Sequence, residues 1–266
     1  MYPRRLSGHE PDTDPFVRLP QASARVAVVF RHLAADALYD AKTSIARFPV
    51  VAMPLQRIRH RGELVDDRTQ VVIEAFPRCA SSFAVAAFRL AQEPTFTHIA
   101  HHTHMPAQVL EGVRRGLPTL VLVRPALDAI VSHLIRSPDL GPAAAMRGYL
   151  RFYGPLVSRR GGFVTATFDE VVGSFGVAIG RLNERFGTAF APFEHTPDHV
   201  ARIEGEIERD YRAREGSGDH LEAVIPRPSA SREAIKAEVA ERVRREVSPR
   251  ALADAHGVYR ALTAQR

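Results

Sequence analysis

Residues 77–83, Pro-Arg-Cys-Ala-Ser-Ser-Phe, combine a cationic side chain with two hydroxyl groups over a short distance. Arg78 supplies the positive charge, and Ser81 and Ser82 supply O–H donors. If a helix begins here, its first backbone N–H groups have no intrahelical partner, and the helix dipole favours negative charge beside them. This pattern therefore predicts a cradle for a phosphate or sulfate group.

The flanking sequence places this cradle between a strand and a helix. An apolar run at 71–76 ends at Pro77, and an Ala-rich amphipathic pattern follows at 83–92. The loop has neither the glycines nor the lysine of a G-x-x-x-x-G-K-[ST] motif, which disfavours ATP hydrolysis. A phosphatase-type loop would need an arginine six residues after Cys79, where this chain has Val85. We interpret Cys79 as a small buried residue, as free cysteines commonly are.

A second arginine follows another apolar run. The run at 119–123 predicts a buried strand that ends before Arg124, and a helix is expected from Ala126. Open α/β folds bind ligands at this edge of the sheet. Ser132 comes eight residues after Arg124, about two helical turns on, and could direct its hydroxyl toward the same anion. A structural salt bridge with Asp128 is the alternative interpretation of Arg124.

The third informative stretch, 96–106, is rich in histidine. His98, His102 and His104 are separated by even numbers of positions, so an extended backbone, in which side chains alternate between two sides, would place them on one side. One hypothesis is a metal site, but no further ligand has convincing spacing, and we expect no metal. The other is a general base on a strand-end loop, for which His104 is the candidate. We interpret His98 and His101 as histidines without a catalytic role.

Apolar runs and helical patterns alternate along most of the chain. Strands are expected at 71–76, 96–100, 119–123 and 163–168, and helices at 22–47, 83–92, 106–115, 126–136, 143–158, 169–186, 197–215, 232–245 and 249–262. Strand and helix alternation predicts an α/β fold with three layers (α/β/α) around a central parallel sheet. Residues 1–20 are expected to form a flexible tail, 216–231 a loop, and 21–266 a single domain.

Composition narrows the class of protein and of partner. The chain has 266 residues, 45% of them hydrophobic, and a net charge of +6. It shows neither a run of the ~20 apolar residues that a membrane span needs nor a signal-peptide pattern, and its single cysteine favours a reducing compartment. We therefore expect a soluble cytoplasmic protein. The basic balance suits an anionic ligand. The sequence contains no basic patch with interleaved aromatic residues, which is the pattern that would indicate nucleic-acid binding.

Taken together and in this order, the three stretches resemble the sulfotransferases that use 3′-phosphoadenosine 5′-phosphosulfate (PAPS). That family's PKSGTTW-like 5′-phosphosulfate loop corresponds to PRCASSF at 77–83, and its KTHLP-like substrate loop to HTHMP at 102–106. Its 3′-phosphate segment corresponds to Arg124 and Ser132, and 164–170 are similar to its strand ending in a Tyr-Glu-Asp type turn. The resemblance covers roughly 71–190 and implies a P-loop NTPase-like architecture.

The resemblance also implies roles for individual residues. Arg78 corresponds to the catalytic cation beside the leaving phosphate, and His104 to the base that deprotonates the acceptor hydroxyl. Phe83 corresponds to an aromatic that stacks on adenine. The full set implied to bind PAPS is Arg78, Cys79, Ala80, Ser81, Ser82, Phe83, Arg124 and Ser132.

Several positions depart from the family pattern. Ala80 replaces a glycine and tolerates positive φ poorly, which leaves open a different turn in the loop. Arg78 replaces a lysine, exchanging a point charge for a planar fork. His102 replaces the lysine before Thr-His. The C-terminal RKGxxGDW element is absent, and the loop Arg227–Arg232 is the nearest substitute by charge and position.

The resemblance implies transfer of a sulfuryl group from PAPS to a hydroxyl of a small-molecule, glycan or lipid acceptor. Two alternatives stay open: a nucleotide-dependent kinase on a related P-loop fold, and an inactive nucleotide-binding scaffold. The sequence specifies neither the acceptor nor the oligomeric state. Variable loops usually build such pockets, and we expect 137–147 and 187–231 to contribute here.

Overall fold

A computed structural model describes residues 21–57, 63–95, 97–215 and 230–264. Its centre is a sheet of four strands in the order β2-β1-β3-β4, and every neighbouring pair is parallel. The strands are β1 (Val71–Ala75), β2 (Ile99–His101), β3 (Thr119–Val123) and β4 (Val164–Thr167). The predicted parallel sheet is confirmed. The tail predicted at 1–20 lies outside the described residues.

The strands form where the sequence is apolar and β-branched. Every residue of β1 and β3 is buried, as expected for parallel strands covered on both faces. β3 has the predicted bounds, and β1 ends one residue early. β2 is shorter than predicted because it begins only at Ile99.

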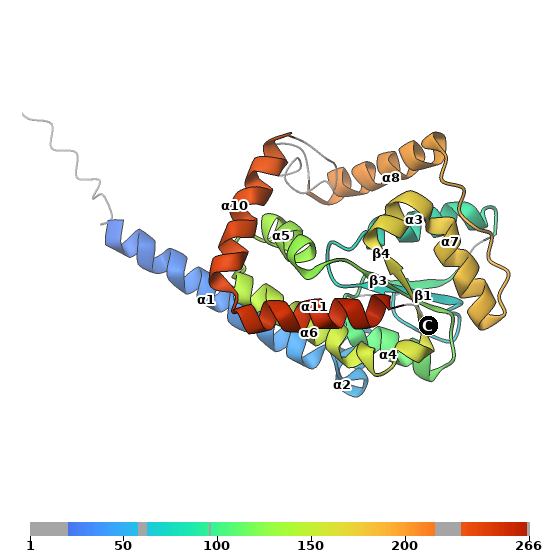
Figure 1. The fold of residues 1–266 in the computed structure, drawn as a ribbon, viewed down its shortest axis with the longest axis horizontal. Coiled ribbons are helices and arrows are strands. Elements are labelled where there is room, and N and C mark those ends of the chain that lie inside the picture. The colour runs from blue at the N-terminus through green and yellow to red at the C-terminus, as the bar shows by residue number, and fades with distance from the viewer. Residues whose placement is uncertain (1–20, 58–62, 96, 216–229, 265–266) are drawn as a thin grey trace, which may run out of the picture.

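Helices cover both faces of the sheet (Figure 1). α3 (Ser81–Gln92) and α7 (Phe168–Phe186) lie on one face. On the other face are α4 (Pro106–Arg114), α6 (Pro142–Val157) and α11 (Pro249–Thr263). The predicted three-layer α/β/α architecture is therefore confirmed.

Further helices surround these layers. They are α1 (Gln21–Ile45), α2 (Pro49–Arg57), α5 (Ala126–Arg136), α8 (Pro197–Glu215) and α10 (Ala230–Glu246). α8 packs on α3, and α10 packs on α5. α2 was not predicted from the sequence; it is short and has Pro54 inside it. Within the described ranges, no helix has the length and apolar character that crossing a membrane requires.

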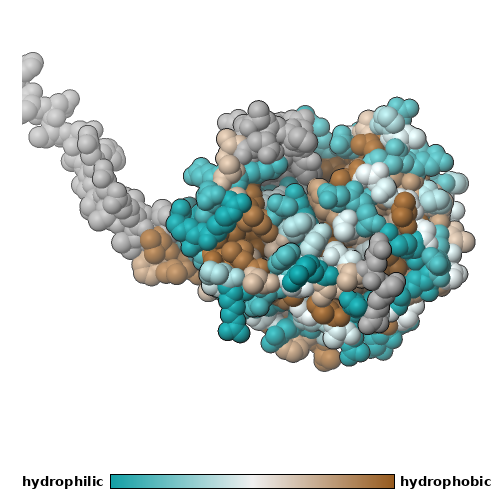
Figure 2. Space-filling view, viewed as in Figure 1, coloured by the Kyte–Doolittle hydropathy of each residue, from teal (hydrophilic) through white to brown (hydrophobic). Residues whose placement is uncertain are grey.

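The second half of α1 docks on α6 through ion pairs. Arg147 Nε donates to Asp40 Oδ1 at 3.0 Å, and Arg151 also pairs with Asp40. The guanidinium of Arg147 is the main cause of the lowered pKa of Asp40. The first half of α1 projects from the body, and exposed apolar side chains, Phe30 and Leu33 among them, gather there (Figure 2). The docked half is the part that reaches the functional site described below.

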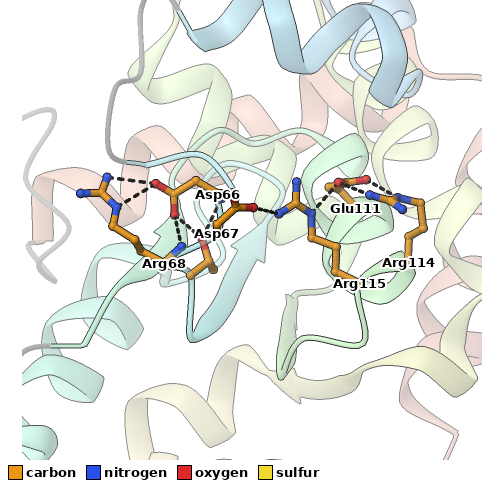
Figure 3. A network of polar contacts seen from close by, with 7 residues as sticks. Asp66, Asp67, Arg68, Glu111, Arg114 and Arg115 are labelled. Carbon is orange, nitrogen blue, oxygen red and sulfur yellow. Dashed lines mark hydrogen bonds and ion pairs between the residues drawn. The ribbon is translucent and has the colours of Figure 1, made fainter.

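A charged network ties the loop before β1 to the end of α4 (Figure 3). Arg115 donates to Asp67 at 3.0 Å and to Glu111 at 2.7 Å, and Arg114 also pairs with Glu111. These arginines lower the pKa of Glu111 to about 2. The network lies at the end of the sheet where β1 and β3 begin, and it stabilises that end. Ligands are expected at the opposite end, beyond the carboxyl ends of the strands.

Candidate functional site

The carboxyl ends of β1 and β3 are adjacent, and their loops touch. Ala75 of β1 pairs with Leu122 of β3, so the segments after both strands leave the sheet side by side. Arg124 Nη1 donates to the backbone carbonyl of Arg78 at 3.0 Å. The two arginines singled out from the sequence therefore lie in one place.

Ser132 and Phe168 complete this junction. Arg78 Nε donates to Ser132 Oγ at 3.1 Å, which connects the first loop to α5. The guanidinium carbon of Arg124 lies 4.0 Å from the ring centroid of Phe168, a cation–π distance. Across the described ranges, Arg124 forms no salt bridge with Asp128, so that alternative interpretation is not realised. Phe168 was not identified from the sequence, although it lies in the stretch that resembles the family's strand-end turn.

One cavity of about 1290 Å³ brings the candidate residues together. Its lining includes Arg78, Ala80, Ser81, Ser82, Phe83, His104, Arg124 and Ser132. Cys79 is the one predicted residue outside this lining. Its side chain is buried, and burial raises the pKa of the thiol to about 11. Cys79 is therefore a packing residue, and only its backbone can serve a ligand.

The loop before α3 adopts the left-handed turn despite its alanine. Ala80 has φ 65° and is the N-cap of α3, with no side-chain cap. The first helical hydrogen bond runs from Ala84 N to Ala80 O, so the preceding N–H groups have no intrahelical partner. Ala80 therefore holds a positive φ, which an alanine tolerates poorly.

Backbone strain concentrates around the cavity. In the described part of the chain, four non-glycine residues have positive φ, and all four line the cavity: Arg78, Ala80, His102 and His104. Conformations of this kind cost of order 1–3 kcal/mol each and cluster at functional sites. The loop after β1 and the loop after β2 therefore hold strained backbone conformations that fix the directions of their side chains.

Two tyrosines of α6 connect the strand ends. The hydroxyl of Tyr153 donates to the carbonyl of Leu122 at 2.6 Å and accepts from Phe76 N at 3.3 Å, so it bridges β3 and the end of β1. Tyr149 donates to the carbonyl of Arg124 at 2.9 Å. This support was not predicted from the sequence. Its only signal is the pair of aromatic residues one helical turn apart.

Glu74 organises the histidine loop from inside the sheet. Its side chain is fully buried in β1. Oε1 accepts hydrogen bonds from Thr103 N and Oγ1, each at 2.8 Å, and from Gln108 Nε2 at 2.9 Å. Oε2 accepts from His104 N at 3.2 Å and from Ala75 N at 3.2 Å. Glu74 was not predicted as a site residue, although a lone acid in a buried strand is a sequence signal for one.

Burial controls the charge of Glu74. Desolvation raises the pKa of its carboxyl to about 7, and the hydrogen bonds from Thr103 and the nearby backbone act in the opposite direction. The carboxylate therefore titrates near neutrality while it holds the loop that carries His104. Strongly shifted carboxyl groups of this kind are common at functional sites.

His104 is arranged as a neutral proton acceptor. Its Nδ1 lies 2.8 Å from the carbonyl oxygen of Ala75, which can only accept, so Nδ1 carries the proton. Burial is the main cause that lowers the pKa of this imidazole. The ring is then neutral near pH 7, with Nε2 unprotonated. This geometry suits the general base expected at this position.

The other histidines differ from the prediction. β2 ends at His101, and His102 and His104 have left-handed backbones, so the extended arrangement predicted for the alternating histidines was wrong. His98 does not line the cavity, whereas His101 does. No group of potential ligands for a metal ion is found among the described residues.

Phe83 belongs to a small aromatic cluster. Its ring centroid lies 6.2 Å from that of Phe193 and 5.8 Å from that of His195. The cluster gives the cavity one aromatic wall beside the first turn of α3. Stacking of Phe83 on a base stays a prediction.

Charge around the cavity is mixed and unevenly placed. The cations are Lys42, Arg78, Arg89, Arg124, Arg136 and Lys236, so both lysines of the chain lie here. The acids include Glu204, Glu206, Glu208 and Asp210, all on α8. α1 also contributes lining residues, which the sequence analysis did not anticipate. Residues 227–229 of the loop proposed to close the site lie outside the described residues, as does the side chain of Arg232.

Comparisons with protein-family models, with curated proteins and with solved structures find no match to this chain. The functional interpretation therefore rests on the residues and on the geometry of the site.

Proposed function

We propose that this protein is a PAPS-dependent sulfotransferase that transfers a sulfuryl group to an acceptor hydroxyl. One observation carries the proposal: the loop after β1 and the segment after β3 meet, with Arg124 Nη1 3.0 Å from the Arg78 carbonyl and Arg78 Nε 3.1 Å from Ser132 Oγ. A nucleotide with phosphates at both ends needs two anion sites of this kind, side by side in one cavity.

The 5′-phosphosulfate end is assigned to the first turn of α3. N–H groups without intrahelical partners, the hydroxyls of Ser81 and Ser82, and the guanidinium of Arg78 all surround this point of the cavity. Donors fixed in advance at a site of developing charge are an effective source of catalysis. Arg78 would stabilise the charge that develops on the leaving phosphate.

The 3′-phosphate end is assigned to Arg124 and Ser132. Arg124 uses Nη1 for the Arg78 carbonyl and stacks on Phe168, so the plane of its guanidinium is held in place. Among the residues that the structure describes, no other hydrogen bond of the Arg124 guanidinium is found, and such a planar fork suits a phosphate. This contact would distinguish PAPS from nucleotides that lack a 3′-phosphate.

His104 is assigned as the general base. PAPS supplies the sulfuryl group. The acceptor oxygen forms a bond to sulfur as the bond between sulfur and the phosphate oxygen breaks, and the acceptor proton passes to Nε2 of His104. The products are a sulfate ester and adenosine 3′,5′-bisphosphate. Glu74 acts through His104 by holding the loop that carries it.

The acceptor is assigned to the part of the cavity between α1 and α5. The ring centroid of His133 lies 5.7 Å from that of Tyr39 and 5.6 Å from that of Phe76, and burial lowers the pKa of His133 to about 3. Its Nε2 is buried and has no hydrogen-bond partner within the described ranges. His133 therefore forms part of the cavity wall as a neutral aromatic ring.

Titration calorimetry tests the nucleotide assignment. Adenosine 3′,5′-bisphosphate should bind at least about tenfold more tightly than ADP, because a charged hydrogen bond contributes roughly 1.5–3 kcal/mol. ATP should bind weakly. Tight ATP binding without a preference for the 3′-phosphate would favour the nucleotide-dependent kinase instead.

Turnover tests the role of His104. The variant His104→Ala should lower sulfuryl transfer about 10²–10⁴-fold while its affinity for adenosine 3′,5′-bisphosphate changes little. Equal losses in turnover and affinity would remove His104 from the role of base. Binding without transfer by the wild type, across phenol, sugar and lipid hydroxyls, would favour the inactive scaffold.

A further inference from the structure

Three side-chain contacts connect α3 to the last residue of β2 and to the loop that follows it. Arg89 Nη2 lies 2.8 Å from His101 Nε2, His101 Nδ1 lies 2.6 Å from His102 Nδ1, and His102 Nε2 lies 3.2 Å from Ser82 Oγ. All four residues line the cavity. Ser82 and Arg89 are seven residues apart on α3, so the series of contacts starts and ends on one side of the same helix.

The chemistry of the first residue sets the direction of every contact. A guanidinium can only donate, so His101 Nε2 accepts from Arg89, and the proton of a neutral His101 is on Nδ1. His101 Nδ1 then donates to His102 Nδ1, which leaves the proton of His102 on Nε2. His102 Nε2 therefore donates to the oxygen of Ser82.

This direction decides what Ser82 can offer a ligand. A hydroxyl has one proton and two acceptor lone pairs. When its oxygen accepts from His102, the Ser82 proton is left for another group. Ser82 lies in the first turn of α3, beside backbone N–H groups that have no intrahelical partner.

We infer that Arg89, His101 and His102 form a hydrogen-bond relay that sets the Ser82 hydroxyl as a donor toward an anion at the start of α3. His101 and His102 are thus positioning residues. The identity of the anion as the 5′-phosphate of PAPS rests on the proposed function, whereas the direction of the relay does not.

The relay requires both rings to be neutral. The 2.6 Å contact between the two Nδ1 atoms has room for a single proton, and a proton on His101 Nε2 would face the Arg89 guanidinium. The two histidines therefore need opposite tautomers, Nδ1–H at His101 and Nε2–H at His102.

NMR of the ligand-free protein tests the direction of the relay without any assumption about function. In long-range ¹H–¹⁵N spectra at pH 8, assigned with His101→Gln and His102→Gln, His101 should show the Nδ1–H tautomer and His102 the Nε2–H tautomer. A Nδ1–H tautomer at His102, or an imidazolium at either position, would overturn the relay.

Two substitutions of His102 separate the relay from a role in backbone geometry. Asn tolerates positive φ best among the non-glycine residues, and His102 has φ 58°. The Asn side chain is too short to replace the Nε2 atom of His102, whereas Gln carries an amide N–H near the position of that atom. The relay predicts that His102→Gln binds adenosine 3′,5′-bisphosphate within about twofold of the wild type and that His102→Asn binds about tenfold more weakly. A role in backbone geometry predicts the reverse order.

The same comparison in a Ser82→Ala background completes the test. Without the hydroxyl, the relay has nothing to orient, so the Gln and Asn variants should bind adenosine 3′,5′-bisphosphate equally. A tenfold difference that persists in this background would contradict the inference. His98→Ala, outside the cavity, is the matched histidine control and should change nothing. If the wild type binds ATP in place of the bisphosphate, the proposed function fails, and the same series measured with ATP still decides on the relay.

Discussion

Replacing Glu74 by Gln should change how the stability of the protein depends on pH. The carboxyl is fully buried in β1, and burial raises its pKa from 4.5 to about 7. The folded state therefore binds this proton more tightly than the unfolded state does, and stability falls as pH rises between these two values. At about 1.4 kcal/mol for each pH unit, the loss across the window is about 3 kcal/mol.

The measurement compares wild type with Glu74→Gln at several pH values. The chain has no tryptophan, so urea unfolding is best followed by far-ultraviolet circular dichroism. The free energy of unfolding of the wild type, minus that of the variant, should fall by about 3 kcal/mol between pH 4.5 and 7. Outside this window the difference should be flat. Curves that stay parallel from pH 4 to 8 would refute the raised pKa.

The substitution also tests the positioning role of Glu74. The amide NH₂ of Gln would face N–H groups of the histidine loop that now donate to a carboxylate oxygen. We expect turnover by Glu74→Gln to fall toward that of His104→Ala, with affinity for adenosine 3′,5′-bisphosphate preserved. Unchanged turnover would remove Glu74 from the support of His104.

Two further predictions concern stability. Tyr153→Phe should lower the free energy of unfolding by about 1–3 kcal/mol in urea, because the Phe76 N–H loses its hydroxyl partner; an unchanged value would show that this bridge does not hold the strand ends. Glu111→Gln should remove only about 1 kcal/mol, since its arginine partners are at the surface. That loss should be complete above pH 4.5 and disappear as pH falls toward 2, where wild-type Glu111 also becomes neutral; a loss that persists at pH 2 would contradict the ion pair.

The sequence predicted the layers of the fold because its apolar runs are continuous and bounded. β3 and α5 have the predicted bounds, and the helices that cover the two faces of the sheet begin and end within two residues of their predicted bounds. β2 was placed too early because Phe96 and Thr97 are residue types that favour strands. α2 was missed because Pro54 breaks its helical pattern.

Site residues were predictable where a side chain directly follows a buried strand in the sequence. Arg78 and Arg124 follow buried strands, and adjacent parallel strands bring such residues together. Much of the support of the site was not predictable, since it depends on contacts between distant segments. Tyr153 and Phe168 reach the site through such contacts, whereas Glu74 could have been identified as the lone acid in a buried strand. The left-handed backbone at His102 also defeated the period-two argument for the histidines.

Nucleotide preference in an Arg124→Ala variant tests the central claim most directly. Calorimetry would compare adenosine 3′,5′-bisphosphate with ADP for wild type, for Arg124→Ala and for Arg114→Ala. Arg114 is the matched control because it lies at the end of α4, before β3 begins, and does not line the cavity. The preference for the 3′-phosphate should fall about 10- to 150-fold in Arg124→Ala and stay unchanged in Arg114→Ala. An undiminished preference in Arg124→Ala would contradict a 3′-phosphate site at the end of β3.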